Sequence, residues 1–170
     1  MIPARPLDGI RVLELAQIVA GPFCGTLMAE FGAEVIKTEM PGRGDDLRRL
    51  GPAEDGHSYW FAVDNRNKKL MTLDLHVPKG QSIVRRLVER CDVVLENFRP
   101  GVLEKWGLGW ETLHAINPRL VMARVTAFGL HPGHQLGHQA GRIERRGSLE
   151  HDADLCAIFI EGHDAVGGGL

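Results

Sequence analysis

The chain has 170 residues, of which 44% are hydrophobic and 25% are charged, the ordinary balance of a globular domain with a buried core. This composition excludes disorder of the whole chain. The formal net charge is −2 and the pI is near 6.4, so the overall charge gives no attraction to nucleic acid or to an anionic membrane surface. A ligand that carries phosphate would have to be held by a local group of cations and backbone N–H groups, which favours a small molecule over a polymer.

The cysteines and the N-terminal segment indicate the compartment. The three cysteines are widely spaced and form no C-x-x-C pair, which argues against a disulfide framework and against a zinc ribbon. The first apolar stretch is interrupted by Arg11, Glu14 and Gln17, which makes it too polar for a signal-peptide core, and no run of about 18 apolar residues follows it. The sequence predicts a cytoplasmic protein without a membrane-spanning segment.

Apolar runs of strand length recur through the first three quarters of the chain. In chain order they lie at residues 10–15, residues 35–36 with their flanks, residues 93–95 and residues 120–125, with an additional candidate at 70–75. Between these runs the apolar residues have helical spacing. We expect each run to form a strand of one sheet.

Three helices are expected between the strands. The first has Pro22 in its first turn and ends at Gly32. The second begins at Pro78, and the third is short, spans residues 110–116 and is closed by an Asn-Pro pair. The second helix places four aliphatic residues on one face: Ile83, Val84, Leu87 and Val88.

The order of the elements predicts the fold class. Near-continuous apolar strands that alternate with helices are typical of a parallel sheet covered on both faces, so we expect a doubly wound, mostly parallel, Rossmann-like α/β fold. The character changes after residue 129, where histidine and glycine recur and only the run LCAIFI is convincingly apolar. We therefore expect an α/β domain over residues 1–129 and a poorly structured tail over residues 130–170.

Five segments carry a resemblance to a known family. They read PLDGIRVLELAQIVAGPF, LMAEFGAEVIKTEMPGRGDDLR, FAVDNRNKKLMTLDL, CDVVLENFRPGVLEKWGLGWETL and NPRLVMARVTAFG, and they lie within residues 6–129. Together they resemble the N-terminal part of the class III coenzyme A transferases, a family that includes formyl-CoA transferase and carnitine-CoA transferase and is related to α-methylacyl-CoA racemase. Gln17 ahead of Ala-Gly-Pro and the Glu-Asn-Phe motif after residue 95 favour the transferases over the racemases.

The resemblance implies a reaction and an assembly. Such a transferase moves CoA from an acyl-CoA to a carboxylic acid through an aspartate nucleophile and an aspartyl-CoA intermediate. Family members are much longer and form interlocked homodimers, which implies that this chain is truncated. After VTAFG the sequence departs from the family pattern, and Asp164 in GHDAVGGGL lacks the flanks of a nucleophile. We therefore assign no catalytic residue and expect the chain to be inactive alone.

The residues after the strand at 93–95 suit the nucleotide end of CoA, which presents an adenine ring and phosphates. Phe98 can stack on a purine, and Arg99 and Lys105 can meet phosphate oxygens. We expect Pro100 to lie in the first turn of a helix, so that the N–H groups of the next two residues are unpaired and face an anion. From these residues alone, a solvated charge and a core ring are the plain alternative.

Further contacts to CoA are implied by the family correspondence, at positions where packing is the plain alternative. They are Ile18, Val19, Met40, Leu73, Asp74 and Asn97. Met40 departs from the basic residue that some transferases have there, so the phosphate or adenine contact made by that residue is not expected to be the same. Arg43 could approach a phosphate, but its loop lacks the residue order of a P-loop, and no ATP or NAD site is expected.

A metal site and two alternative functions remain to be considered. His131, His134 and His138 are close in sequence, but a proline and two glycines among them break any helix that would present them, so no metal site is expected. The first alternative function is a relative of α-methylacyl-CoA racemase, which needs a His and an acid for proton transfer. The second is a non-catalytic truncated protein that associates through apolar surface normally covered by the missing part.

Overall fold

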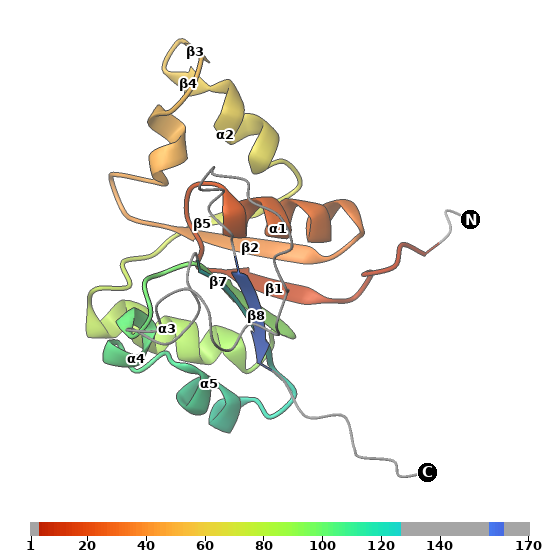
Figure 1. Cartoon of the computed structure of the whole chain (residues 1–170), viewed down its shortest axis with the longest axis vertical. Helices are drawn as coiled ribbons and strands as arrows, with labels where there is room; N and C mark the ends of the chain where they lie inside the picture. Colours follow the sequence, from red (N-terminus) through yellow and green to blue (C-terminus); the bar gives the residue numbers. More distant parts are fainter. Residues whose placement is uncertain (1–3, 127–156, 162–170) are drawn as a thin grey trace, which may run out of the picture.

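A computed structural model describes residues 4–126 and the strand at residues 157–161. Its main feature is a six-stranded sheet in the order β5-β2-β1-β6-β7-β8 (Figure 1). The first five strands are parallel, and β8 pairs with β7 in the antiparallel sense. The strands are β1 (Arg11–Glu14), β2 (Glu34–Glu39), β5 (Lys69–Thr72), β6 (Val93–Glu96), β7 (Val121–Thr126) and β8 (Ala157–Glu161).

The strand order confirms the predicted doubly wound fold. The chain begins at β1 in the middle of the sheet, moves outward through β2 to β5, and then crosses back to place β6 and β7 on the other side of β1. This is the Rossmann order, in which the direction of winding reverses between two central strands, here β1 and β6. Five of the strands fall where the apolar runs predicted them.

The tail contributes one strand to this sheet. The apolar run noted in the sequence overlaps β8, which pairs along β7 with Thr126 opposite Ala157. Residues 127–156 and 162–170 lie outside the described residues, so the expected division of the chain at residue 129 stays a prediction.

Three of the helices were predicted. They are α1 (Ala20–Glu30), α3 (Pro78–Val88) and α5 (Trp110–Ile116). The sequence analysis missed α2 (Tyr59–Asp64), a 3-10 helix η1 (Asp46–Arg49), and a small hairpin of β3 (Ala53–Glu54) and β4 (His57–Ser58). The short helix α4 (Val102–Lys105) begins later than expected, as described below.

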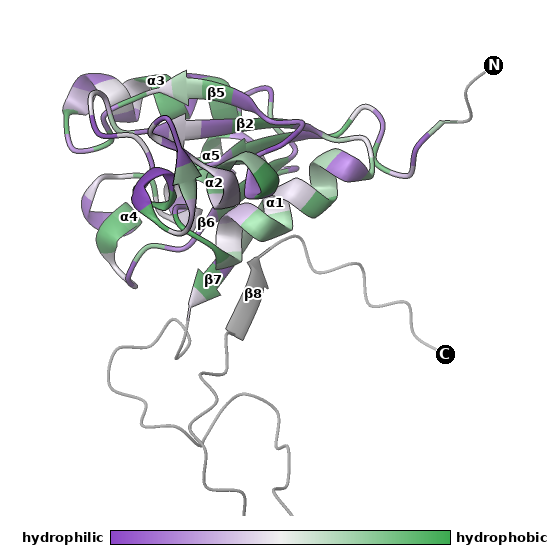
Figure 2. Ribbon diagram, turned by 90° about the horizontal axis from the view of Figure 1, so that it is seen from above, coloured by the Kyte–Doolittle hydropathy of each residue, from purple (hydrophilic) through white to green (hydrophobic). Residues whose placement is uncertain are grey.

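The core lies on both faces of the sheet because side chains alternate along each strand. Figure 2 shows where the apolar residues lie along the strands and the helices that surround them. In β1, Leu13 belongs to the larger cluster under α3, α4 and α5, whereas Val12 belongs to the smaller cluster under α1. Val84 and Val88 of α3 are buried in the larger cluster, which confirms the predicted apolar face of that helix. Gly25 allows α1 to approach the sheet closely, since a Cβ there would lie 2.0 Å from Glu14 Oε2.

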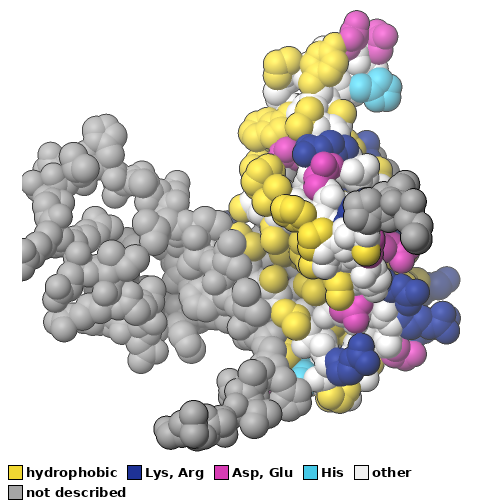
Figure 3. Space-filling view, turned by 90° about the vertical axis from the view of Figure 1, so that its right-hand side faces the viewer, with side chains coloured by type: hydrophobic (Ala, Val, Ile, Leu, Met, Phe, Trp, Pro, Cys, Tyr) yellow, Lys and Arg dark blue, Asp and Glu magenta, His cyan; other side chains and the backbone are white. Residues whose placement is uncertain are grey.

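The outer side of α1 is unusually apolar. Phe23, Leu27 and Phe31 recur every four residues and are 49%, 43% and 54% exposed, and we call these three residues the α1 stripe. Figure 3 shows hydrophobic side chains gathered in a band on this side of the molecule. Within residues 4–126 and 157–161, the structure contains no helix long and apolar enough to cross a bilayer.

Candidate functional site: a cavity at the carboxyl edge of the sheet

A cavity of about 220 Å³ lies where the carboxyl ends of the central strands meet. Its lining comes from the end of β2, from the segments that follow β1, β2, β5 and β6, and from Trp106, which directly follows α4. Open α/β sheets bind ligands at this edge, at the point where the strand order reverses. The lining residues are Gln17, Thr38, Glu39, Met40, Arg43, Gly44, Asp46, Leu73, Leu75, His76, Phe98 and Trp106.

Two aromatic rings form the apolar wall. Phe98 is half-buried and meets Trp106 edge to face, with ring centroids 5.3 Å apart. His76 meets the same Trp106 ring at 4.9 Å. The ring of Phe98 therefore packs against the core and still lines the cavity, so it is available to a flat ligand ring.

The lining also includes the cation Arg43. Its guanidinium donates to the carboxylate of Asp46, with Nη2 2.9 and 3.1 Å from the two oxygens. This hydrogen bond lowers the pKa of Asp46, and Arg49 adds to the effect. Arg43 is 66% exposed, so an anion in the cavity could share it with Asp46.

His76 is presented by a tight turn after β5. Asp74 Oδ1 accepts the backbone N–H of His76 at 2.9 Å and lies 3.0 Å from its ring Nδ1. These contacts lower the pKa of Asp74. The carboxylate of Asp74 is thus directed to His76, and it is His76 that lines the cavity.

Of the residues predicted to contact CoA, Met40, Leu73 and Phe98 line the cavity. The others lie around it without lining it. Ile18, Val19 and Asn97 belong to the turns after β1 and β6, and Asp74 pairs with His76. Arg99, before α4, and Lys105, its last residue, are exposed. Gln17, His76 and Trp106 line the cavity but were absent from the predicted contacts, although each follows the end of a strand or of α4.

The expected anion site at the start of α4 is wrong in its geometry. Pro100 lies in the turn before the helix, and Gly101 caps α4 with a left-handed φ of 85°. The N–H of Val102 donates to the carbonyl of Arg99 at 3.1 Å, so it does not face an anion. A helix of four residues also has little dipole to offer. The reason is that Gly101 favours a left-handed turn at the position where the prediction required helical backbone.

Side chains from other segments bind the backbone of three consecutive residues in the turn after β1. Ala16 O accepts from Lys37 Nζ at 2.8 Å, and Gln17 exchanges two hydrogen bonds with the Asn97 amide, at 2.8 and 2.7 Å. The N–H of Ile18 donates to both carboxylate oxygens of Asp45, at 3.0 and 3.1 Å. Ile18 has a φ of 69°, which for a β-branched residue costs on the order of 1–3 kcal/mol.

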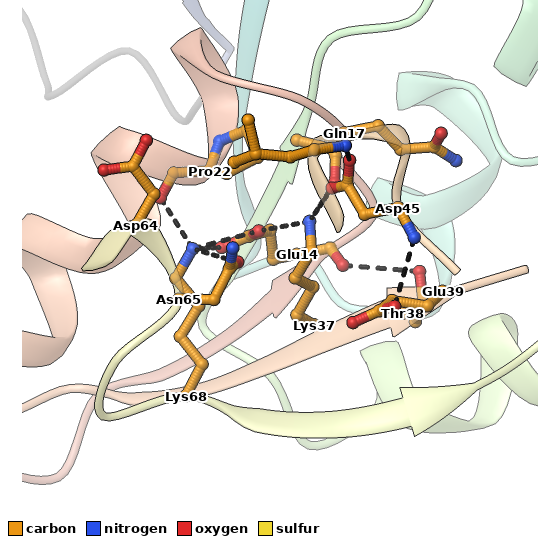
Figure 4. A network of polar contacts seen from close by, with 12 residues as sticks. Glu14, Gln17, Pro22, Lys37, Thr38, Glu39, Asp45, Asp64, Asn65 and Lys68 are labelled. Atoms are coloured by element: carbon orange, nitrogen blue, oxygen red, sulfur yellow. Dashed lines mark hydrogen bonds and ion pairs between the residues drawn. The ribbon is translucent and has the colours of Figure 1, made fainter. Parts of the chain in front are cut away.

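Behind this turn lies a cluster of four charged side chains with 0% exposure (Figure 4). Lys37 Nζ lies 2.7 Å from Asp45 and 3.0 Å from Glu14, and Lys68 Nζ lies 2.9 Å from Glu14. Lys68 also donates to Pro22 O at 2.7 Å. Burial raises the pKa of Glu14 and lowers the pKa of Lys68, and the opposite charges only partly offset it. Two cations and two carboxylates leave the cluster electrically balanced.

A second buried ion pair supports Phe98. Arg124 of β7 donates to Glu96 Oε1 at 2.6 Å and reaches Glu104 of α4 at 2.8 Å. The other oxygen of Glu96 accepts the N–H of Phe98 at 2.7 Å. Burial raises the pKa of Glu96, and the hydrogen bond from Arg124 opposes this rise. This pair therefore fixes both the turn that carries Phe98 and the helix α4, which Trp106 directly follows.

The fold and the cavity together define a class of protein: a doubly wound α/β domain with a cavity, lined by aromatic rings and a cation, where the strand order reverses. The model of CoA-transferase family III matches residues 7–142 of this chain. The chain therefore belongs to CoA-transferase family III, as the sequence resemblance indicated. The match covers most of the α/β domain and all residues that line the cavity.

Individual relatives agree with this assignment. The chain is 60% identical over 128 residues to succinyl-CoA–D-citramalate CoA-transferase of Chloroflexus aurantiacus, which covers 75% of this chain and 32% of that protein. It is 43% identical over 130 residues to formyl-CoA:oxalate CoA-transferase of Afipia carboxidovorans, covering 76% and 31%. The chain thus spans about a third of the length of the curated relatives it matches.

Solved structures show the same fold. A hypothetical protein of Mycobacterium tuberculosis superposes with a TM-score of 0.72 at 46% identity, over 78% of this chain and 36% of that one. A CaiB/BaiF family protein from Brucella suis gives a TM-score of 0.66 at 46% identity, over 71% and 33%. Asp164 and the histidines His131, His134 and His138, which the sequence analysis considered and did not assign, lie outside the described residues.

Proposed function

We propose that this domain binds the CoA moiety of an acyl-CoA substrate in the cavity at the carboxyl edge of its sheet. One observation carries the proposal: in a chain of CoA-transferase family III, an aromatic pair and a cation line a single cavity where the strand order reverses. Phe98 and Trp106 offer a platform for the adenine ring, and Arg43 offers a guanidinium to a phosphate. Gln17 and Thr38 supply polar groups on the wall nearest to β1 and β2.

The proposed reaction is transfer of CoA between an acyl-CoA and a carboxylic acid. An aspartate carboxylate attacks the thioester carbonyl and releases the CoA thiolate, which then attacks the resulting anhydride to form an aspartyl-CoA thioester and free the first acid. The acceptor carboxylate repeats the two steps in reverse. None of residues 4–126 is assigned as the nucleophile, so we expect this chain to bind CoA without turnover. Because of the relative named for succinyl-CoA and citramalate, succinyl-CoA is the first donor to test.

Isothermal titration of the 170-residue chain with CoA tests the proposal. Phe98→Ala should weaken binding by about 1–3 kcal/mol, because a stacked base is lost. Phe31→Ala removes a ring of the same kind from the exposed side of α1, which does not line the cavity, and should leave the affinity within about twofold. A wild-type chain that gives no heat with CoA would refute the proposal. Deuterium incorporation at the α-carbon of a 2-methylacyl-CoA would instead favour the racemase alternative.

The α1 stripe favours a second function, association with another copy of this chain. Three large apolar side chains on one exposed helix face are uncommon in a monomer, and burying them would stabilise a complex. Light scattering should then show a mass that grows with concentration and falls for Leu27→Glu. A monomer at all concentrations would rule this function out. A cytoplasmic location and a homodimer of the complete protein are likewise proposals.

A further inference from the structure

The turn between β1 and α1 has a conformation that its own sequence does not favour. Ile18 is β-branched, yet its φ is 69°, in the left-handed region where glycine is the usual residue. The turn contains no glycine until Gly21. Groups outside the turn must therefore hold Ile18 in this conformation. They bear on the cavity because Gln17, the preceding residue, lines it.

Asp45 is the group that holds Ile18. Its carboxylate is completely buried and accepts the Ile18 N–H through both oxygens, at 3.0 and 3.1 Å. The same carboxylate accepts the N–H of Leu47 at 2.9 Å and lies 2.7 Å from Lys37 Nζ (Figure 4). Asp45 thus joins three elements: the turn after β1, the start of η1, and the buried lysine of β2.

This connection links two walls of the cavity. Gln17, on one side, is adjacent in sequence to Ile18, and its side chain lines the cavity. Arg43, Gly44 and Asp46, on the other side, flank Asp45 and line the cavity too. Asp45 itself is absent from the lining, so it acts on a ligand only through its neighbours.

We infer that Asp45, with Lys37 as its counter-charge, is a positioning residue that sets the two cavity walls in place by keeping Ile18 left-handed. This inference rests on the proposed function, because CoA is the ligand whose binding the walls would control. Without the carboxylate, Ile18 would return to a negative φ and its N–H would turn away, so that only the two hydrogen bonds to Asn97 would hold Gln17 in place. A carboxylate suits this role better than a neutral acceptor, because Lys37 brings a buried positive charge that needs a partner.

A double-mutant cycle between Asp45 and Ile18 separates positioning from a general loss of stability. Asp45→Asn should weaken CoA binding about tenfold, because the strain of one left-handed residue corresponds to a factor of roughly 5 to 150. Glycine adopts a positive φ without penalty, so in an Ile18→Gly background the same change should weaken binding less than about threefold. Ile18→Gly alone is measured as the reference, since Ile18 is itself a candidate contact. A loss of general stability would weaken binding equally in both backgrounds.

The controls keep the test decisive. Asp92→Asn makes the same change in a carboxylate that accepts the Arg11 N–H at 2.9 Å, near the opposite end of β1, and should leave the affinity within about twofold. If Asp45→Asn does not fold by circular dichroism, Lys37→Met/Asp45→Asn removes both members of the pair and leaves Glu14 with Lys68. That variant should lose affinity in the same direction.

Amide hydrogen exchange supplies a readout that needs no ligand. In Asp45→Asn, exchange in a peptide that covers residues 15–22 should be faster than in the wild type, and the increase should be smaller in the Ile18→Gly background. If the wild type binds CoA and Asp45→Asn changes the affinity by less than about twofold, the inference is overturned. If the wild type binds no CoA, the proposed function fails, and the exchange data then decide whether Asp45 holds the turn. Equal effects in both backgrounds would also overturn the inference.

Discussion

Replacement of Arg124 by methionine tests whether the buried pair behind Phe98 supports the domain. The guanidinium of Arg124 is 6% exposed and lies 2.6 Å from Glu96, which is 1% exposed. Its removal leaves a carboxylate buried without a cation, which costs about 3–5 kcal/mol. The further contact with Glu104 is 44% exposed on the carboxylate side and adds at most about 1 kcal/mol. At about 2–4 °C per kcal/mol for a chain of this length, the melting temperature should fall by roughly 6–20 °C.

The assay is urea unfolding of the wild type, Arg124→Met and Arg124→Met/Glu96→Gln at pH 7. The double variant should recover about half of the loss or more, because the amide carries no charge and its oxygen can still accept the N–H of Phe98. The reasoning would be refuted if the single variant lost less than about 1 kcal/mol in free energy of unfolding, or if the double variant regained none of that loss.

The loss in free energy of unfolding caused by Arg124→Met, which we call the deficit, should depend on pH in one direction. Burial already raises the pKa of Glu96 above its ordinary value of 4.5, and without Arg124 the opposing hydrogen bond is lost, so the pKa rises further. A carboxyl group with a raised pKa in the folded state favours folding below its unfolded pKa, and this contribution is lost as the pH rises through the folded pKa. The deficit of Arg124→Met should therefore be largest at neutral pH and shrink as the pH falls toward 4.5. A deficit that does not change over this range would contradict the assignment of its cause to Glu96.

Two further predictions address the packing of α3 and the cation that lines the cavity. Gly80→Ala should destabilise the domain by about 1–3 kcal/mol despite the better helix propensity of alanine, because the new Cβ would lie 1.8 Å from the backbone oxygen of Asp74. Ser82→Ala, on the exposed side of the same helix, should be neutral in thermal unfolding, and equal effects of the two changes would contradict this account. Arg43→Gln should weaken CoA binding, and more at low salt than at high salt, whereas Arg86→Gln should not, since Arg86 is exposed on α3 and does not line the cavity. Equal losses for both would mean that the cations act through net charge alone.

Local periodicity was sufficient to predict most of the fold. The strands of the parallel sheet are short apolar runs, and α1 and α3 carry a proline in the first turn, so each signal lies within a dozen residues. The helix α2 was missed because its apolar residues are exposed and show no buried face, with Trp60 at 42% and Val63 at 56% exposure. A pattern rule that depends on burial has no signal in such a segment.

The site was predicted less completely, for a physical reason. Phe98 was found because an aromatic residue after an apolar strand is conspicuous, and the family correspondence pointed to Met40 and Leu73. The buried charges could not be found in the same way, because a glutamate or lysine within a strand normally indicates a face exposed to water. Glu14 and Lys37 are buried only because each meets a partner on another strand, at a distance in sequence that no local pattern encodes.

The balanced cluster behind the β1–α1 turn limits how this sequence can change over time. Glu14, Lys37, Asp45 and Lys68 cancel one another in a space that water does not enter, so a substitution that alters one charge leaves an excess charge with nothing to screen it. A substitution that changes the charge at one of these positions is then tolerated only if the charge of a partner changes too. In homologous sequences these four residues should therefore change in pairs that keep the net charge of the cluster at zero.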